Sequence, residues 1–180
     1  MKNTLLIFIS GLIVGGSVMY FFIQPIPQSY EITRLKTFSD KQGSVSEESV
    51  LYTNEQYGFS FSYPKGLVYK EFDEGAGAQT IVFQKPNDIK TGFQIYVTPY
   101  AEKTITGERI LYDASGAVSD LKEEYLRDDF IVATFESDAP IFGKTREIWF
   151  LHGGYLFEVT TYAELDEWLR GIVKTVKFTP

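Results

Sequence analysis

The stretch TREIWFLHGGYLFEVTTY, residues 145–162, constrains the fold more than any other part of the sequence. Gly153 and Gly154 at its centre can adopt the positive φ angles that a tight hairpin turn requires. Pairing across such a turn places large side chains opposite one another on both faces, in the pairs Ile148 with Val159, Phe150 with Phe157, Leu151 with Leu156 and Trp149 with Glu158. The sequence therefore predicts a central antiparallel hairpin that is covered on both sides.

A strand with one buried face is predicted by YGFSFSYP, residues 57–64. Every second position carries an aromatic ring, in the order Tyr57, Phe59, Phe61 and Tyr63, and this alternation is typical of a half-buried strand. Exposed in one row, the rings would form an edge liable to aggregate, so we expect them in the core.

Further strands are expected at three alternating runs: Thr80–Gln84, Gly92–Thr98 and Phe130–Phe135. Gly75 to Ala78 is interpreted as a hairpin connection, because this glycine-rich run lacks the lysine of a phosphate-binding loop. Thr106 is placed to cap a short helix over Glu108–Tyr112.

A closing amphipathic helix is predicted after Thr161, because the residues from Thr161 to Glu164 fit a capping box. Its apolar stripe contains Leu165, Trp168, Leu169, Ile172 and Val173, and its solvent-facing side contains Asp166, Glu167, Arg170 and Lys174. Hairpin and helices together predict an α+β domain, with helices packed on an antiparallel sheet.

The first residues have a different composition. Leu5 to Ile23 carries no charge, and as a helix it would be about 28 Å long, which matches a bilayer's hydrocarbon core. The alternative is a cleaved signal peptide with Gly15 and Ser17 at its cleavage site, but the apolar run continues beyond them. We expect residues 1–24 to form an uncleaved single-pass anchor in the cell membrane. The positively charged Lys2 end is then cytoplasmic, and the C-terminal domain lies outside.

Residues 25–49 are interpreted as a flexible linker, because two prolines follow the apolar run and SDKQGSVSEES has almost no apolar periodicity. The linker joins the anchor to a domain at residues 50–180. The chain has a net charge of -7. Because such a chain repels phosphate backbones, nucleic acid is not an expected partner.

Three segments, YGFSFSYPKGL, TREIWFLHGGYLFEVTTY and ELDEWLRGIVKTVKF, resemble bacterial PsbP-like proteins over roughly residues 52–178. PsbP is the extrinsic subunit P of photosystem II. The resemblance implies an α–β–α sandwich, in which an antiparallel sheet has helices packed on both faces. Leu67 departs from the pattern, since relatives often place a tryptophan soon after the YP. The role of photosynthetic members at the oxygen-evolving cluster is not carried over, because none of their metal-handling residues can be placed here.

Catalytic groups are scarce. The chain has no cysteine and one histidine, His152, which excludes thiolate chemistry and a two-histidine metal site. Ser115 lies in DASGA, which lacks the nucleophile elbow, and we expect His152 to be a solvent-facing residue beside the turn. No cofactor is expected. Acidic turns at Glu71, Asp73 and Glu74 and at Asp128 and Asp129 lack the spacing of an EF-hand and are interpreted as solvated, with weak calcium binding as the alternative.

These observations favour a non-catalytic envelope domain that binds another protein through its loops. The residues proposed to form that surface are Glu71, Asp73, Glu74, Gln79, Asp138 and Lys144. The alternatives are a carrier of a small apolar or aromatic ligand held between sheet and helix, and an enzyme that uses carboxylates alone.

Overall fold

The computed structural model describes residues 48–114, 116–140 and 143–179. The predicted anchor at residues 1–24, and all but the last two residues of the predicted linker at 25–49, lie outside these ranges. Within the described ranges, no helix is long and apolar enough to cross a membrane.

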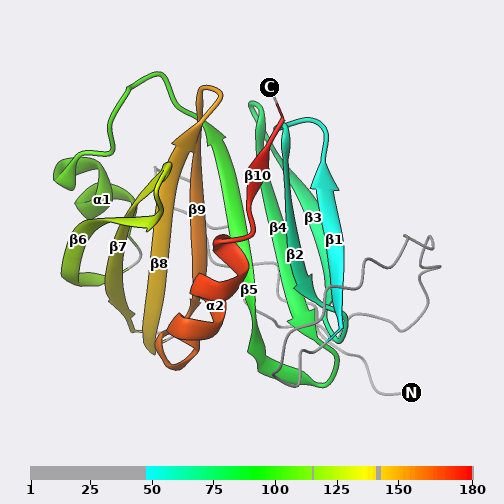
Figure 1. The fold of residues 1–180 in the computed structure, drawn as a ribbon. Coiled ribbons are helices and arrows are strands. Elements are labelled where there is room, and N and C mark those ends of the chain that lie inside the picture. The colour runs from blue at the N-terminus through cyan, green and yellow to red at the C-terminus, as the bar shows by residue number, and fades with distance from the viewer. Residues whose placement is uncertain (1–47, 115, 141–142, 180) are drawn as a thin grey trace, which may run out of the picture.

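Most of the described chain forms one antiparallel sheet of seven strands (Figure 1). The order across this large sheet is β3-β4-β5-β9-β8-β7-β6. The strands are β3 (Val68–Gly75), β4 (Ala78–Lys85), β5 (Asp88–Pro99), β6 (Ala117–Arg127), β7 (Phe130–Ala139), β8 (Gly143–His152) and β9 (Tyr155–Tyr162). Three predicted strands are thus confirmed within β4, β5 and β7, and β3 and β4 form the predicted hairpin.

The hairpin of β8 and β9 lies in the middle of the large sheet, as predicted. Gly153 and Gly154 form its turn with φ angles of 59° and 84°, which glycine adopts without a steric penalty. All four expected cross-strand pairs are present, including Ile148 with Val159 and Phe150 with Phe157. Side chains on both faces of the hairpin are buried, so its central position is confirmed.

A second, three-stranded sheet packs over one face of the large sheet (Figure 1). It contains β1 (Ser49–Asn54), β2 (Phe59–Pro64) and β10 (Lys177–Phe178), with β2 in the centre. Helix α2 (Asp166–Val173) lies beside this small sheet and contributes Leu169, Ile172 and Val173 to the same core.

The aromatic row at residues 57–63 forms the middle of this larger core. All four of its rings are buried, and the ring of Phe61 lies 5.2 Å from that of Phe83 and 5.9 Å from that of Phe93. The rings therefore hold the two sheets together. The expectation that they belong to the core is confirmed.

A smaller core lies on the other face of the large sheet and contains Tyr100, Ile110, Phe135, Trp149 and Leu156. Helix α1 (Gly107–Asp113) supplies Ile110 to this core. Thr106 caps α1 as predicted, because its side-chain oxygen accepts a hydrogen bond from the backbone N–H of Arg109 at 3.1 Å.

The expected fold class, helices packed on both faces of the sheet in an α–β–α sandwich, is wrong. The described residues are mostly antiparallel strand, and α1 and α2 span only seven and eight residues. The alternating rings of residues 57–63 need an apolar surface opposite them, and the large sheet supplies that surface. A second sheet therefore covers most of the larger core, and α2 only fills the space beside it.

The predicted start of the closing helix is also wrong. Thr161 belongs to β9, and its hydroxyl donates to the carbonyl oxygen of Gly92 at 2.7 Å instead of capping a helix. A 3₁₀ turn at Ala163–Leu165 follows, and α2 begins at Asp166. Arg170, which was expected to face solvent, is buried.

Candidate functional site

A cleft of about 740 Å³ opens where β7 and β8 separate, and its volume lies within the range of ligand-binding pockets. Pairing between these strands ends at Ala133 and Trp149. Strand β7 nevertheless begins at Phe130, and β8 continues to His152. The first residues of β7 therefore face the last residues of β8 across a gap instead of across a ladder of hydrogen bonds.

Both walls of this cleft pair with another strand on the side that faces away from the cleft. Residues 130–132 of β7 pair with β6, and residues 150–152 of β8 pair with β9. In an antiparallel strand, every second residue directs its N–H and C=O groups towards a given neighbour. Each wall therefore keeps a strand conformation and offers backbone groups to the cleft.

The lining of the cleft is mixed, and it includes apolar side chains on both sides of the large sheet. On the side of the smaller core it includes Ile105, Ile110, Ile131, Trp149 and Leu151. On the side of the larger core it includes Phe130, Phe150 and Phe178. Charged lining residues are Lys103, Lys122, Glu123 and Asp129.

His152 lies at the end of the β8 wall. Its ring stacks on that of Phe178, with centroids 3.7 Å apart and planes 14° apart. The expectation that His152 is simply solvent-facing is therefore wrong, since the residue is half-buried, and this burial lowers the pKa of its imidazole. Among the described residues, no hydroxyl or carboxylate forms a hydrogen bond with His152, so the structure shows no catalytic pair around it.

The turn between β6 and β7 lies at the rim of the cleft and is held by contacts to the chain after α2. Arg127 donates from Nη1 to the carbonyl oxygens of Lys174 and Val176, at 3.0 and 2.6 Å. The same guanidinium lies over the ring of Phe130, 5.2 Å from its centroid. These contacts connect the β7 wall to the backbone that follows α2.

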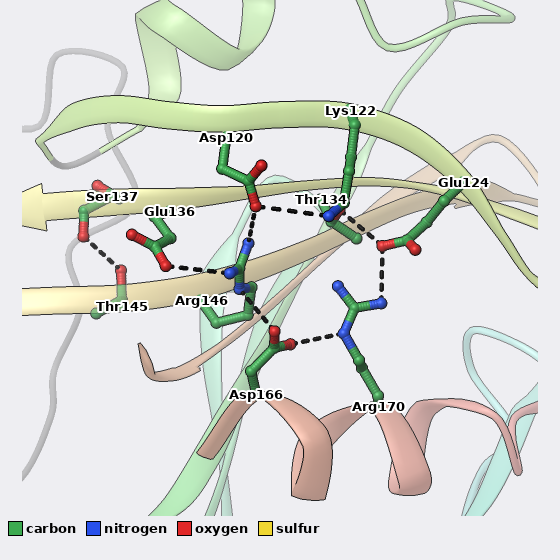
Figure 2. Close-up of polar contacts among 10 residues, drawn as sticks. All are labelled: Asp120, Lys122, Glu124, Thr134, Glu136, Ser137, Thr145, Arg146, Asp166 and Arg170. Atoms are coloured by element: carbon green, nitrogen blue, oxygen red, sulfur yellow. Dashed lines mark hydrogen bonds and ion pairs between the residues drawn. The ribbon is translucent and has the colours of Figure 1, made fainter. Parts of the chain in front are cut away.

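A network of ion pairs joins α2 to β6, β7 and β8 (Figure 2). Arg146 of β8 contacts Asp120, Glu136 and Asp166 at 3.3, 3.1 and 3.2 Å. Arg170 of α2 contacts Asp166 and Glu124, each at 2.7 Å. Figure 2 shows the two guanidinium groups directed towards carboxylates of their own chain. Because both arginines are already paired, this network is interpreted as structural.

Glu124 shows how this network acts electrostatically. Burial alone would raise the pKa of its carboxyl, but hydrogen bonds from Arg170 and Thr134 hold the pKa below its usual value. The charged form is therefore the stable one in the folded protein. Its ion pair with Arg170 is therefore favoured at neutral pH.

Glu147 is a buried carboxyl that the sequence analysis did not single out. The hydroxyls of Thr145 and Thr160 donate to it at 2.8 and 2.6 Å, and the indole N–H of Trp149 donates at 3.3 Å. Burial raises the pKa of Glu147 to about 7, against these three hydrogen bonds. An acidic residue within a strand predicted to be covered on both sides was the signal that could have identified it.

The six residues proposed for partner binding fall into two separate groups. Glu71, Asp73 and Glu74 lie on the exposed edge strand β3, and Gln79 lies next to them on β4. Asp138 and Lys144 pair with each other across β7 and β8, at the end of β8 opposite to His152. The two groups lie near different edges of the large sheet and are strand positions rather than loops.

Two of these residues also make internal contacts. Glu71 accepts a hydrogen bond from the hydroxyl of Tyr52 at 2.7 Å, and Gln79 accepts one from the side-chain amide of Asn54 at 2.9 Å. They therefore connect β3 and β4 to β1 of the small sheet. Their role in partner binding stays a prediction.

Ser115 lies outside the described residues. Within those residues, no group of three or more His, Cys, Asp or Glu side chains is arranged to hold a metal ion.

Comparison with known proteins identifies the fold. No protein family and no curated protein matches the chain. The solution structure of cyanobacterial PsbP (CyanoP) from Synechocystis sp. PCC 6803 matches 78% of this chain and 98% of its own length, with a TM-score of 0.51 and 11% identity. A crystal structure from Bacteroides thetaiotaomicron matches 72% of this chain and 48% of its own length, with a TM-score of 0.41 and 17% identity. The chain therefore has a PsbP-like fold, and at 11% identity the likeness extends to the fold alone.

Proposed function

We propose that this protein is a membrane-anchored, extracytoplasmic domain that binds another protein of the cell envelope and catalyses no reaction. The observation that carries the proposal is the cleft between β7 and β8. It combines apolar lining residues with two strand edges that have no strand partner in the cleft. The imidazole of His152 stacks on Phe178 instead of forming a hydrogen bond with a catalytic group. Such a site is suited to binding.

The sequence supports the absence of catalysis. A chain without cysteine and with a single histidine has few groups for nucleophilic, redox or metal chemistry. The buried carboxyl of Glu147 receives hydrogen bonds from neighbouring side chains within the sheet, which is how a structural polar group is accommodated.

The proposed anchor would allow a weak interaction with the partner to be sufficient. If residues 1–24 hold the chain in the membrane, the linker at 25–49 keeps the domain within a few nanometres of the bilayer. The effective concentration for a membrane-bound partner then reaches the millimolar range, on the order of that for short flexible linkers. Modest affinity is sufficient under these conditions.

A second candidate function is favoured by the volume of the cleft. About 740 Å³ is enough for a small apolar or aromatic ligand, so the protein is alternatively an anchored carrier. The site for such a ligand would be the cleft between β7 and β8, rather than the space between the sheet and α2. Protein binding and ligand carriage can be compared by measuring whether an apolar fluorescent dye and the partner compete for the cleft.

The proposal is tested by exchanging the anchor. Cells lacking the protein receive the intact chain, residues 50–180 behind an unrelated membrane helix, or residues 50–180 alone. We expect the foreign helix to restore the cellular role and the free domain at native abundance to fail. Full restoration by the free domain would refute the tether.

Retention of the anchor is measured separately. Membranes are washed with alkaline carbonate, and the mature protein is expected in the pellet with its first residues intact. A soluble chain that starts near Val18 would show that the apolar segment is a cleaved signal peptide.

A further inference from the structure

We propose that the cleft between β7 and β8 binds an extended peptide segment of the partner, which enters the large sheet as a short strand between them. This inference rests on the proposed function of protein binding and adds the site and the chemistry of the partner. The carrier function would place a small molecule in the same cleft, so the two alternatives make different predictions for the backbone of its walls.

The backbone of the two walls favours a peptide. Residues 130–132 and 150–152 are strand on both sides of the gap, yet they pair only with β6 and β9. Groups that face the cleft have hydrogen-bonding capacity that an apolar molecule cannot satisfy, and leaving such groups unpaired on burial is costly. A peptide in extended conformation has donors and acceptors on both of its edges and can satisfy both walls.

The two faces of the cleft define the side chains of the segment. Successive residues of a strand point to opposite faces of a sheet. One set of side chains would therefore face the rings of Phe130, Phe150 and Phe178, which pack on one another at that side of the cleft. The other set would contact Ile105, Ile131 and Leu151. The segment is expected to carry apolar residues at consecutive positions, facing alternately to the two sides.

The charge of the chain defines the flanks of the segment. At the rim, Lys122 pairs with Asp120 and Asp129 pairs with Arg127, so these side chains favour neither sign. The chain as a whole has a net charge of -7, which attracts basic sequences over longer distances. We therefore expect lysine or arginine on either side of the apolar core of the segment.

The outer edge of the large sheet at β3 is a less suitable site for the same segment. Every residue of β3 is exposed, so a strand added there would bury few of its side chains. In the cleft, an added strand would be enclosed by a wall on each side and by apolar residues on both faces. The outer edge therefore serves as the comparison site in the experiment.

The experiment uses the full chain in lipid nanodiscs, with empty nanodiscs as the blank. The probe is a panel of labelled peptides of the form Lys-Lys-X-Z-X-Z-Lys-Lys, in which X and Z are Val, Ile, Leu or Phe. Each peptide has a twin in which two backbone nitrogens of the core are methylated. The twins keep every side chain and charge but lose backbone donors.

Two protein variants locate the binding site. Ile131→Asp places a charge in the β7 wall, and Ile89→Asp places the same charge on the distant β5. Both isoleucines are exposed, at 44% and 56%, so neither change should unfold the domain. Circular dichroism and the midpoint of urea unfolding verify that both variants remain folded.

We expect at least one peptide of the panel to bind, and its methylated twin to bind at least about tenfold more weakly, as the loss of one or two hydrogen bonds implies. Ile131→Asp should abolish binding and Ile89→Asp should leave it unchanged. Amide hydrogen exchange should slow at residues 130–132 and 150–152 on binding.

Four outcomes would overturn the inference. The first two are no binding by any peptide and equal binding of a peptide and its methylated twin. The third is amide exchange that slows at β3 instead of the cleft, and the fourth is a peptide that an apolar dye displaces and that never changes the amide exchange of the cleft walls. None of these results refutes protein binding through another surface, or the tethered domain that the anchor exchange tests independently. The failure of this inference is therefore distinguishable from the failure of the proposed function.

Discussion

Arg146 and Arg170 contact the same carboxylate, Asp166, at 3.2 and 2.7 Å. One arginine lies on the central strand β8 and the other on α2, and the shared carboxylate is at the start of α2. The closing helix is therefore connected by charge to the half of the large sheet that contains the cleft.

Replacing Arg146 with methionine should destabilise the domain. The side chain of Arg146 is 8% exposed, and its loss removes the guanidinium shared by Asp120, Glu136 and Asp166. Asp166 keeps Arg170 and Asp120 keeps Lys122, but Glu136 loses its ion pair. Because these carboxylates are partly solvated, we expect a cost of about 2–3 kcal/mol in the free energy of unfolding, below that of a fully buried pair. Urea unfolding measures the cost. Lys65→Met, which removes an exposed pair with Glu48, is the control and should cost under about 1 kcal/mol. Equal costs for the two variants would show that the network adds no stability.

Removing the rings of the central hairpin should cost more. Phe150 and Phe157 are buried, and their rings stack at 4.9 Å. Phe150→Ala or Phe157→Ala should each lower the free energy of unfolding by about 3–5 kcal/mol. Ser60→Ala, on the less buried face of β2, should cost little. An unchanged urea midpoint in Phe150→Ala would contradict the assigned facing of β8.

Glu147 should make stability depend on pH. Its folded pKa of about 7 lies above the usual value of 4.5, so its contribution is complete at pH values below 4.5 and is lost as the pH rises through 7. The loss amounts to about 3 kcal/mol. Glu147→Gln should remove this decline, so the difference in free energy of unfolding between variant and parent should grow from pH 5 to pH 8. Parallel pH profiles of the two proteins would refute the raised pKa.

His152→Ala should leave the fold and the cellular role intact. The variant loses the stack on Phe178, which is worth about 1 kcal/mol. In the parent protein, NMR titration should find the pKa of His152 below its usual value of 6.5, because the ring is partly buried. A well-folded His152→Ala protein that still binds peptide in the cleft but lacks any cellular function would instead favour an enzyme.

Sequence periodicity predicted the elements whose own alternation of residues marks a buried face. The two glycines at 153–154 determined the register of β8 and β9, and the alternation of residues 57–63 correctly identified a buried face. Periodicity shows that a face is buried but not what covers it. The small sheet is formed mainly by β1 and β2 and is completed by β10, which has only two residues and pairs with a strand far away in the sequence. A pattern of two residues carries no signal, so a helical layer was expected in its place.

The candidate site was less accessible to sequence reasoning. The cleft exists because pairing between β7 and β8 stops at Ala133 and Trp149, while both strands continue on their other sides. Local residue patterns are the same for a paired and an unpaired strand edge. Arg170 was expected to face solvent for a similar reason, because the carboxylates that bury it come from other elements.

Site-specific crosslinking in living cells tests the central claim, a tethered domain that holds its partner in the cleft, most directly. A photoreactive amino acid replaces Ile131 in the cleft wall or Ile89 on β5, both in the intact anchored chain. Crosslinked proteins are then identified by mass spectrometry. We predict one envelope protein crosslinked from position 131, through an extended apolar segment with basic flanks, and no such product from position 89. The absence of any protein crosslinked from position 131, or the same product from both positions, would contradict the claim.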